Sequence, residues 1–444
     1  MFIKKLYSAL RYHRVNRHRR NFKHLIQCIL ILAFIVTGGS VIAQPFKYST
    51  PEDDPDDLSV WPNKTSRSNS DAWLAENHDK IRLMQPRLLV INFSNEKDND
   101  YLLGMLGKII AAVAESSRYH GYKNPDAPAF LNYRVFKYVD LRDADKKEGN
   151  SSKVPFKIEQ KSGFNIEYNR FFGNEFAKYY GVEDVETKGK YLRLDELVDR
   201  GYVHEVWFFA EHLRDFGAFE VVELKPVYDN QFKKVDNKYV RAGNGGDPDQ
   251  KWTGRSVRIA FINPSRGIGC FMESLSHGIE GMANSGAIPY FTKYFREFAG
   301  FNLRSEYPQF KHSSFYALGP NDRIDYPDPK TAIIKIGNSV IVLSNYVARG
   351  GNVHFPPNGR FHYDLSNTQK VMSTIEDWRI GSAPDGKDVA TEWSIEAFKK
   401  YRDFAPDCMG PWLIYWRQNF PGLNNRQKDD EGKPMKNWWV FLFY

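Results

Sequence analysis

The sequence predicts an α/β protein with an open, mostly parallel sheet flanked by helices, followed by an aromatic-rich, loop-rich C-terminal extension. Short apolar runs alternate with helix-like segments between residues 87 and 298, which is the pattern of a sheet with helical crossovers. The first run, RLLVINF at 87–93, is continuously apolar, as in a strand buried on both faces. Beyond residue 300, long segments are rich in proline, glycine and aromatic residues. We therefore expect an α/β core over 73–300 and a loop-rich extension of the same globular unit over 301–444.

The N-terminal segment 1–43 has the features of a secretory signal peptide. Residues 1–24 contain eight basic residues and no acidic one, and an apolar stretch from Leu25 to Val36 follows. Val41 and Ala43 fit the small-residue positions before a cleavage site, so we expect cleavage after Ala43. The alternative is an uncleaved anchor, because Leu25–Ala43 is nearly long enough to span a bilayer. Both interpretations export the body to the periplasm, the cell surface or the medium, with membrane contact only through this segment if it stays uncleaved.

The charge distribution argues against a nucleic-acid partner. The net charge is +8, but removing the eight basic residues of the leader leaves 54 basic residues against 54 acidic ones. A neutral body has no electrostatic footprint for a phosphate backbone. The exported part keeps two cysteines, Cys270 and Cys408, which permit a single disulfide in an oxidising compartment. The sequence leaves open whether they pair.

Residues 44–72 are rich in Pro, Ser, Asp and Asn and predict a disordered linker. In the core, apolar runs predict strands and apolar residues at helical spacing predict helices. The expected strands are 87–93, 133–140, 203–210, 219–224 and 257–262. The expected helices are 101–119, 171–180, 194–200, 268–283 and 290–298, and residues 228–255 are expected to form a surface excursion. In the extension, Gly337-Asn338 predicts a hairpin of strands 331–336 and 339–344, and helices are expected over 368–379, 391–404 and 412–420.

The stretch 257–283 joins a strand, a turn and a helix, and it holds polar groups that a reaction site could use. Ligands of open α/β sheets bind beyond the carboxyl ends of the strands. Here the turn contains Arg266 and enters the helix through Gly267 and Gly269, so Arg266 and exposed N–H groups could receive an anion. The alternative is an ordinary capped loop with Ser265 as the N-cap. The sequence has no phosphate loop, dinucleotide fingerprint or nucleophile elbow, so we expect no nucleotide cofactor.

Three polar residues of this helix, Glu273, His277 and Glu280, share one face at 100° per residue. That face lies opposite the apolar stripe that is expected to pack on the sheet. A histidine with two carboxylates suits Zn²⁺ or another borderline-hard ion. The alternative is a solvated helix face. Gly278 and Gly281 favour a covered face, because small residues let another segment approach closely.

Residues 349–365 are the segment that we expect to cover this face. Gly350-Gly351 permits a tight bend, and the prolines that follow push His354 toward extended geometry. His354, His362 and Asp364 supply the ligands or the base that a site at the helix would lack. The alternative for His354 is a hydrogen bond in a packed turn.

Glu205, in the predicted strand VHEVWFFA, is a second candidate position. It shares a strand face with Trp207, because alternate residues of a strand point the same way. An unpaired carboxylate would be costly to bury there, so a partner or a site is implied. A structural ion pair and a catalytic role both stay open.

Aromatic residues make up 15% of the chain, and several tryptophans lie in or beside polar segments. They are either platforms for stacking sugars or anchors of the core and loops. The tryptophans concerned are Trp252, Trp378, Trp393, Trp412 and Trp416.

Four blocks of the chain, VHEVW, SRGIG…SHGIEGM, GGNVHFPPN and HYDLSN, resemble a family of secreted bacterial proteins of unassigned activity. The resemblance covers roughly residues 200–380 and is loose between the blocks. It implies no reaction. It does imply that six residues belong to the family pattern: Glu205, Arg266, His277, Glu280, His354 and Asp364.

Together these observations predict an exported hydrolase-type enzyme that acts on an envelope or extracellular substrate. His277, Glu280 and His354 are predicted to hold a divalent metal such as zinc, with Glu273 or Asp364 as general base. Glu205 and Arg266 complete the predicted catalytic set. The sequence does not choose among peptide, amide, ester and glycan bonds. The alternative function is a non-catalytic envelope module that binds glycan or protein through its aromatic C-terminal loops.

Overall fold

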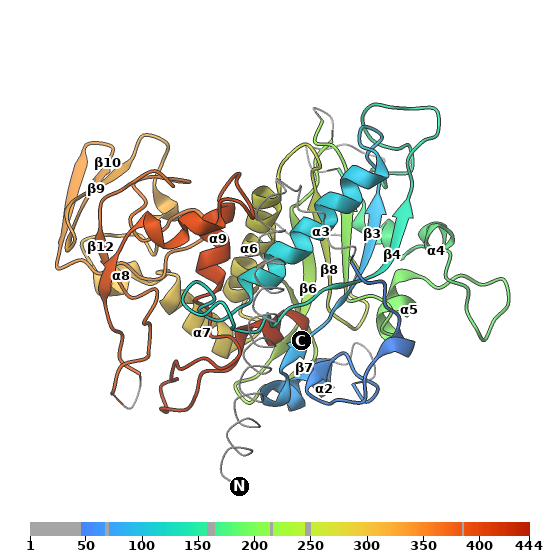
Figure 1. Ribbon diagram of the computed structural model, residues 1–444, viewed down its shortest axis with the longest axis horizontal. Coiled ribbons are helices and arrows are strands. Elements are labelled where there is room, and N and C mark those ends of the chain that lie inside the picture. The colour runs from blue at the N-terminus through green and yellow to red at the C-terminus, as the bar shows by residue number, and fades with distance from the viewer. Residues whose placement is uncertain (1–45, 67–70, 158–164, 214–215, 245–249, 384–385) are drawn as a thin grey trace, which may run out of the picture. The chain divides into compact units, whose positions relative to one another are not determined.

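A six-stranded sheet with the strand order β4-β3-β5-β8-β6-β7 is the framework of the computed structural model (Figure 1). Four strands run parallel, whereas β6 pairs antiparallel with β8 and β7 pairs antiparallel with β6. The prediction of an α/β protein is therefore right at the level of a mixed sheet with helices, but the sheet is less parallel than predicted. The strands are β3 (Arg87–Asn92), β4 (Arg134–Asp140), β5 (Glu205–Phe209), β6 (Val221–Tyr228), β7 (Lys234–Arg241) and β8 (Val257–Ile262).

The structure describes residues 46–66, 71–157, 165–213, 216–244, 250–383 and 386–444. These residues belong to one unit, which extends from Pro45 to Tyr444. The predicted signal peptide or anchor over 1–43 lies outside the described residues. Within the described ranges, no helix combines the length and the apolar character that crossing a membrane requires.

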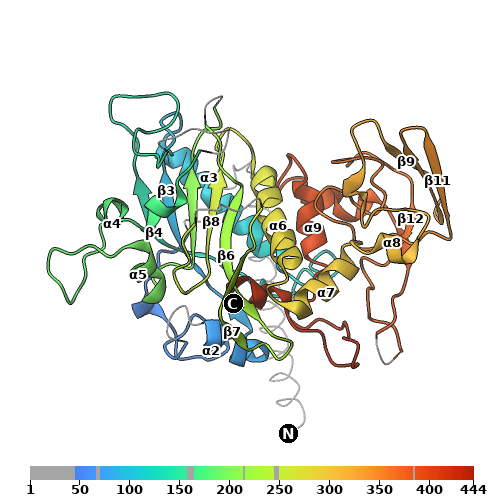
Figure 2. The same ribbon diagram turned by 180° about the vertical axis from the view of Figure 1, so that it is seen from behind.

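Both faces of the sheet are covered, which explains why its central strands are continuously apolar. Leu88 and Val90 of β3 point into one core, and Leu89 and Ile91 point into the other. The first core includes α3 and α6, and the second includes α4 and α5; Figure 1 and Figure 2 show the sheet from its two sides. These helices are α3 (Asn99–Ser116), α4 (Asn174–Tyr180), α5 (Leu194–Asp199) and α6 (Ile268–Ser285), with a 3₁₀ turn η3 at Tyr168–Phe172.

The polar segment at the start of the body is ordered, so the prediction of a disordered linker over 44–72 is wrong for residues 46–66. Strand β1 (Val60–Trp61) pairs with β2 (Leu83–Met84). The Trp61 side chain is only 1% exposed, and Asp54 forms a buried ion pair with Arg87 of β3. The burial of Trp61 and the ion pair of Asp54 therefore hold in place a segment whose average composition is typical of a disordered chain. The helical turns nearby are η1 (Pro51–Asp53), α2 (Asp71–Asn77) and η2 (His78–Lys80).

The predicted surface excursion over 228–255 contains the edge strand β7. Most of its side chains are exposed, and the strand pairs only with β6. A polar edge strand of this kind carries no apolar alternation, which is why the sequence pattern did not reveal it.

The C-terminal region contains a three-stranded antiparallel sheet in the order β11-β10-β9. The hairpin predicted at Gly337-Asn338 is confirmed, with Ile336 paired to Ser339. The helix predicted over 368–379 is wrong, because β12 forms there and pairs with β13. The helix predicted over 391–404 is right in part: the range begins with β13 and continues as the 3₁₀ helix η5. The elements are β9 (Arg323–Asp328), β10 (Thr331–Ile336), β11 (Ser339–Ser344), β12 (Val371–Ser373), β13 (Thr391–Trp393), η4 (Phe315–Ala317) and η5 (Ile395–Tyr401).

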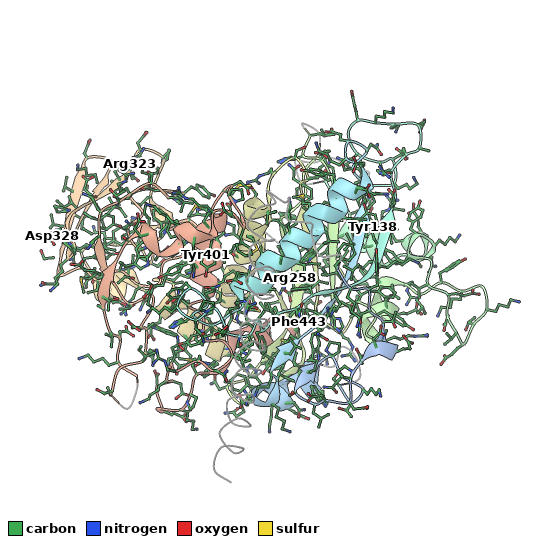
Figure 3. All side chains as sticks on the ribbon, viewed as in Figure 1. Tyr138, Arg258, Arg323, Asp328, Tyr401 and Phe443 are labelled. Atoms are coloured by element: carbon green, nitrogen blue, oxygen red, sulfur yellow. A yellow bond between two sulfur atoms is a disulfide. The ribbon has the colours of Figure 1, made fainter. Side chains whose placement is uncertain are left out.

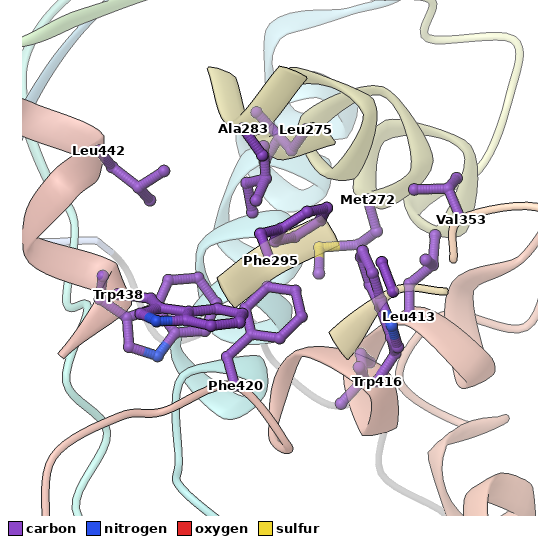
Figure 4. Close-up of a cluster of buried hydrophobic side chains, with 14 of the residues drawn as sticks. Met272, Leu275, Ala283, Phe295, Val353, Leu413, Trp416, Phe420, Trp438 and Leu442 are labelled. Atoms are coloured by element: carbon purple, nitrogen blue, oxygen red, sulfur yellow. The ribbon is translucent and has the colours of Figure 1, made fainter. Parts of the chain in front are cut away.

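Figure 1 and Figure 2 both place α6 between the sheet and α9. Figure 4 shows a cluster of buried hydrophobic side chains, in which Met272 of α6 lies near Phe295 and Trp416. Four of the tryptophans considered as sugar platforms, Trp378, Trp393, Trp412 and Trp416, are buried in this core. The remaining helices are α7 (Pro289–Phe298), α8 (Leu303–Glu306), α9 (Gly410–Arg417) and η6 (Trp438–Phe443).

Candidate metal centre

The turn between β8 and α6 is held from the C-terminal region. The Asp407 carboxylate accepts hydrogen bonds from the backbone N–H groups of Gly269 (2.9 Å) and Cys270 (3.4 Å), at the N-terminus of α6. A Cβ atom at Gly269 would lie 2.0 Å from the Asp407 carbonyl oxygen, so only glycine permits this approach. A disulfide between Cys270 and Cys408 fixes the same contact. The helix N-terminus therefore receives an internal carboxylate, and neither an anion site at its N–H groups nor a Ser265 cap exists there.

The face of α6 that carries Glu273, His277 and Glu280 is covered, which excludes a solvated helix face. Glu273 is 6% exposed and Glu280 is 5% exposed. The two glycines beside them do allow a close approach, but by the sheet and not by residues 349–365. A Cβ atom at Gly278 would lie 3.2 Å from Val221, and one at Gly281 would lie 2.5 Å from a backbone oxygen of the segment that follows β7.

The loop at 349–365 instead contacts the polar side chains themselves. The backbone N–H of Val353 donates to the Glu280 carboxylate at 3.0 Å, which positions the next residue, His354, against α6. The Nε2 atom of His354 then lies 3.0 Å from the Nε2 atom of His277. The expectation that this loop brings His354 to His277 agrees with the geometry.

Hydrogen bonds at the far side of each ring determine where the proton of each histidine lies. A carboxylate can only accept, so Nδ1 of His277 donates to Glu280 at 3.0 Å. A carbonyl oxygen can only accept, so Nε2 of His362 donates to Leu318 at 2.9 Å. With that proton on Nε2, Nδ1 of His362 accepts a hydrogen bond from Nδ1 of His354, at 2.9 Å.

Both neutral rings consequently direct a lone pair at the same point. With Nδ1 a donor in His277 and in His354, each neutral ring has an acceptor at Nε2, and two acceptors 3.0 Å apart repel unless a cation or a proton lies between them. Because the pKa of His277 is raised by its hydrogen bond to Glu280 and by the charge of that carboxylate, a protonated His277 can also supply this proton. Glu273 approaches this point as well, with its Oε1 atom 3.9 Å from Nε2 of His277. The arrangement has the polarity of a cation site.

The three groups fit a small divalent ion. One donor atom from each of Glu273, His277 and His354 lies within 4.8 Å of the other two. Two ligands of a tetrahedral Zn²⁺ site, each about 2.1 Å from the ion, are about 3.4 Å apart. Two histidines and one carboxylate are a ligand set of catalytic zinc sites, which leave a fourth position open. Glu280 and His362 hold the outer nitrogens, as outer-shell partners of metal-bound histidines do.

The electrostatic environment differs between the two histidines. Burial disfavours the charged form of His277, but its hydrogen bond to Glu280 and the charge of that carboxylate outweigh burial and raise its pKa. Burial, together with the nearby His277 and His362, lowers the pKa of His354 to about 3. Burial also raises the pKa of Glu273. In neutral His354 the Nε2 lone pair accepts a hydrogen bond from the Tyr363 hydroxyl at 2.7 Å, so a metal ion bound by Nε2 would displace that hydroxyl.

A cavity of about 520 Å³ opens onto the three groups. Its wall includes Arg266 and Asn263 from the turn after β8, so the turn and the α6 face belong to one site and not to two. Tyr363 also lines the cavity, 49% exposed, with its hydroxyl 2.7 Å from Nε2 of His354. Its backbone has a φ of 66°, which a residue with a side chain rarely adopts outside functional or strained positions. Glu220 is a further carboxylate on the cavity wall.

The roles of two predicted residues are exchanged by this geometry. Glu280 was expected to bind the metal, but both its oxygens are used by Tyr316, Val353 and His277. Glu273 was expected to act as general base, but its carboxylate is the one that faces the two Nε2 atoms. Both side chains lie on one helix face, so spacing along the helix could not tell which one points at His354.

Asp364 lies outside the site, contrary to its predicted role as a base. The carboxylate accepts from Arg360 Nε at 2.6 Å and from the hydroxyl of Ser366 at 2.7 Å. The backbone N–H groups of Arg360 and Ser366 also donate to the Asp364 carboxylate. Asp364 therefore stabilises the turn that presents His362 and Tyr363.

Glu205 also lies outside the site and is part of a buried structural network. It accepts from Tyr133 at 2.8 Å and from Trp207 at 3.0 Å, and it forms an ion pair with Arg258. Arg258 and Phe443, both labelled in Figure 3, are buried, and Arg258 also donates to the backbone oxygen of Leu442, next to Phe443. The contacts therefore agree with the structural alternative for Glu205, which does not line the cavity at Glu273, His277 and His354.

Four residues of the site were not recognised in the sequence: Glu220, Tyr316, Tyr363 and Asp407. Tyr363 adjoins His362 in the HYDL block, which was a usable signal. The others come from three separate segments with no motif. Comparison of the chain with protein-family models, with curated proteins and with solved structures finds no match, so the geometry alone carries the functional argument.

Proposed function

We propose that this protein is an exported, metal-dependent hydrolase whose divalent ion is held by Glu273, His277 and His354. The observation that carries the proposal is the convergence of two Nε2 lone pairs at 3.0 Å, each fixed by a hydrogen bond on the other side of its ring. The ligand set favours Zn²⁺. The cavity beside it gives a substrate access to the ion.

A divalent ion at this point would polarise a substrate carbonyl and lower the pKa of a water molecule. The chain supplies the remaining functions. Glu280 and His362 hold the two imidazole rings in orientation. The Tyr363 hydroxyl lies 2.7 Å from Nε2 of His354, and with a metal ion on that nitrogen it would donate instead to a substrate oxygen that gains negative charge. Glu220, on the cavity wall, is the carboxylate that we assign as proton acceptor.

Two observations support export. The sequence begins with a basic segment and an apolar stretch that fit a signal peptide or anchor. Cys270 and Cys408 form a disulfide, which persists in oxidising compartments.

The alternative of a glycan-binding module has less support. Four of the five tryptophans that could stack on sugars are buried. Trp252 stacks on Tyr239 at a centroid distance of 5.0 Å and is remote in sequence from the C-terminal loops.

The proposal is tested by hydrolysis assays on metal-free and zinc-loaded protein with chromogenic esters, peptide amides and glycosides. We expect one substrate class to be cleaved only by the zinc-loaded form, with loss of activity in His277→Ala. His312→Ala is the matched control, because His312 is exposed and lies outside the cavity. Cleavage that survives in His277→Ala would contradict the proposal. Binding of peptidoglycan by both variants without any cleavage would favour the glycan-binding module.

A further inference from the structure

Arg266 extends from a rigid turn into the wall of the same cavity. Its backbone N–H donates to the carbonyl of Asn263 at 3.1 Å, and the N–H of Ser265 donates to the Asn263 side chain at 3.0 Å. The following residue, Gly267, packs directly against Asp407. The Arg266 side chain therefore starts from a fixed point close to the candidate ligands.

The Arg266 guanidinium has no carboxylate partner among the described residues. The guanidinium donates to Sγ of Cys408 at 3.3 Å, and the side chain is exposed. The buried Arg258, by comparison, is neutralised by Glu205 and Glu223. The Arg266 charge acts on Glu273 of the same cavity but forms no salt bridge with it, and a guanidinium on a cavity wall in this state is suited to bind an anionic group of a ligand.

Two neighbouring groups that could otherwise bind an anion are already occupied. The N-terminus of α6 holds the Asp407 carboxylate. The Ser265 hydroxyl donates to Glu211 at 2.6 Å. The guanidinium is therefore the group of this turn that is free to bind an anion from the cavity.

We propose that the substrate carries a carboxylate, which Arg266 binds while the bond to be cleaved lies at Glu273, His277 and His354. This inference rests on the proposed function and adds the substrate class. Arginine binds a carboxylate through two parallel N–H···O bonds, which fixes the orientation of the ligand as well as its position. A cavity of about 520 Å³ holds a small ligand or one end of a longer one. The carboxylate belongs to a peptide or to an acidic sugar.

A matched pair of hydroxamates tests the proposal, because both bind a metal ion and only one carries a carboxylate. The probes are succinic acid monohydroxamate and butanehydroxamate, titrated into zinc-loaded wild type, Arg266→Gln and Arg266→Lys. We expect wild type to prefer the carboxylate probe by roughly 10- to 100-fold, as a charged hydrogen-bonded pair provides. Arg266→Gln should lose this preference with little change for butanehydroxamate, and Arg266→Lys should retain part of it. Arg323→Gln, which alters an exposed arginine of β9, is the control.

Each outcome decides a separate point. Equal binding of the two probes by wild type, or a preference that persists in Arg266→Gln, would overturn the carboxylate proposal. If zinc improves the binding of neither probe, the metal centre is wrong. In that case the carboxylate site is tested separately, by following the NMR signal of the Arg266 Nε–H group while succinate is titrated into the metal-free protein. A change in the chemical shift of this signal supports carboxylate binding by Arg266, and an unchanged chemical shift overturns it. Competition by N-acetyl-dialanine or by glucuronate distinguishes a peptide carboxylate from a sugar carboxylate.

Discussion

The Nε2 atoms of His277 and His354 lie 3.0 Å apart although 77 residues separate them in the chain. Each ring is fixed from behind, His277 by Glu280 and His354 by His362. Their lone pairs converge at the floor of a cavity that also contains Glu273. The following predictions depend on this relationship.

Glu280→Gln tests the assignment of Glu280 as the partner of a ligand and not as a ligand. The amide cannot accept two strong hydrogen bonds as the carboxylate does, so His277 loses its orientation. We expect the affinity for Zn²⁺, measured by competition with a chelating dye, to fall about 10- to 100-fold. Glu273→Gln, which removes a ligand, should lower it further. Equal losses in the two variants would show that Glu280 binds the metal directly, while Glu396→Gln, at an exposed position, should match wild type.

Tyr363→Phe removes the hydroxyl that lies 2.7 Å from Nε2 of His354. Since the proposed role of this hydroxyl is to stabilise developing charge, kcat should fall roughly 10²- to 10³-fold. The affinity for Zn²⁺ should stay within a factor of a few, because none of the three proposed ligands changes. Unchanged kcat would refute the role of Tyr363. A large loss of zinc binding would instead identify its oxygen as a ligand.

Glu205→Gln separates structural from catalytic carboxylates. The substitution weakens a buried network in which Arg258 keeps only Glu223 as a charged partner. We expect the free energy of unfolding in urea to fall by about 3 kcal/mol, near the lower end for a broken buried ion pair. Zinc affinity and kcat of the folded variant should equal those of wild type. Loss of activity without loss of stability would restore a catalytic role for Glu205.

Two buried histidines outside the site make stability depend on pH. Burial lowers the pKa of His78 and of His120 from 6.5 to about 3. Below pH 6.5 the unfolded chain therefore binds more protons than the folded one, so stability is present above this pH and is lost as the pH falls toward 3. Between pH 6.5 and 5 each histidine should reduce the free energy of unfolding by about 2 kcal/mol. Urea unfolding at both pH values should show a smaller difference in His120→Gln, and an unchanged difference would count against this explanation.

The buried parts of the fold follow from local sequence. The strand Val257–Ile262 was predictable because it is buried on both faces and its sequence is therefore almost continuously apolar. The hairpin at Gly337-Asn338 was predictable from its turn residues. The helix expected over 368–379 fails, and the one expected over 391–404 is limited to Ile395–Tyr401, because a short segment of each range pairs as a strand. There tertiary contacts override helical spacing, which a single sequence does not reveal.

The site was predictable in part, for a related reason. Helical spacing brings Glu273, His277 and Glu280 to one face, and the prolines after His354 mark its loop as a rigid partner. Whether Glu273 or Glu280 faces His354 depends on the hydrogen bond between the Val353 backbone N–H and Glu280, and this contact forms only in the folded protein. The cap at the start of α6 comes from Asp407, 138 residues after Gly269, with no local signal.

The zinc content of the purified protein tests the central claim most directly. After dialysis against Zn²⁺ and removal of the excess, elemental analysis should find one zinc ion per chain in wild type. The same measurement should find none in the double variant His277→Ala/His354→Ala, with His312→Ala as control. Zinc at the wild-type level in the double variant, or none in the folded wild type, would contradict a metal centre at Glu273, His277 and His354.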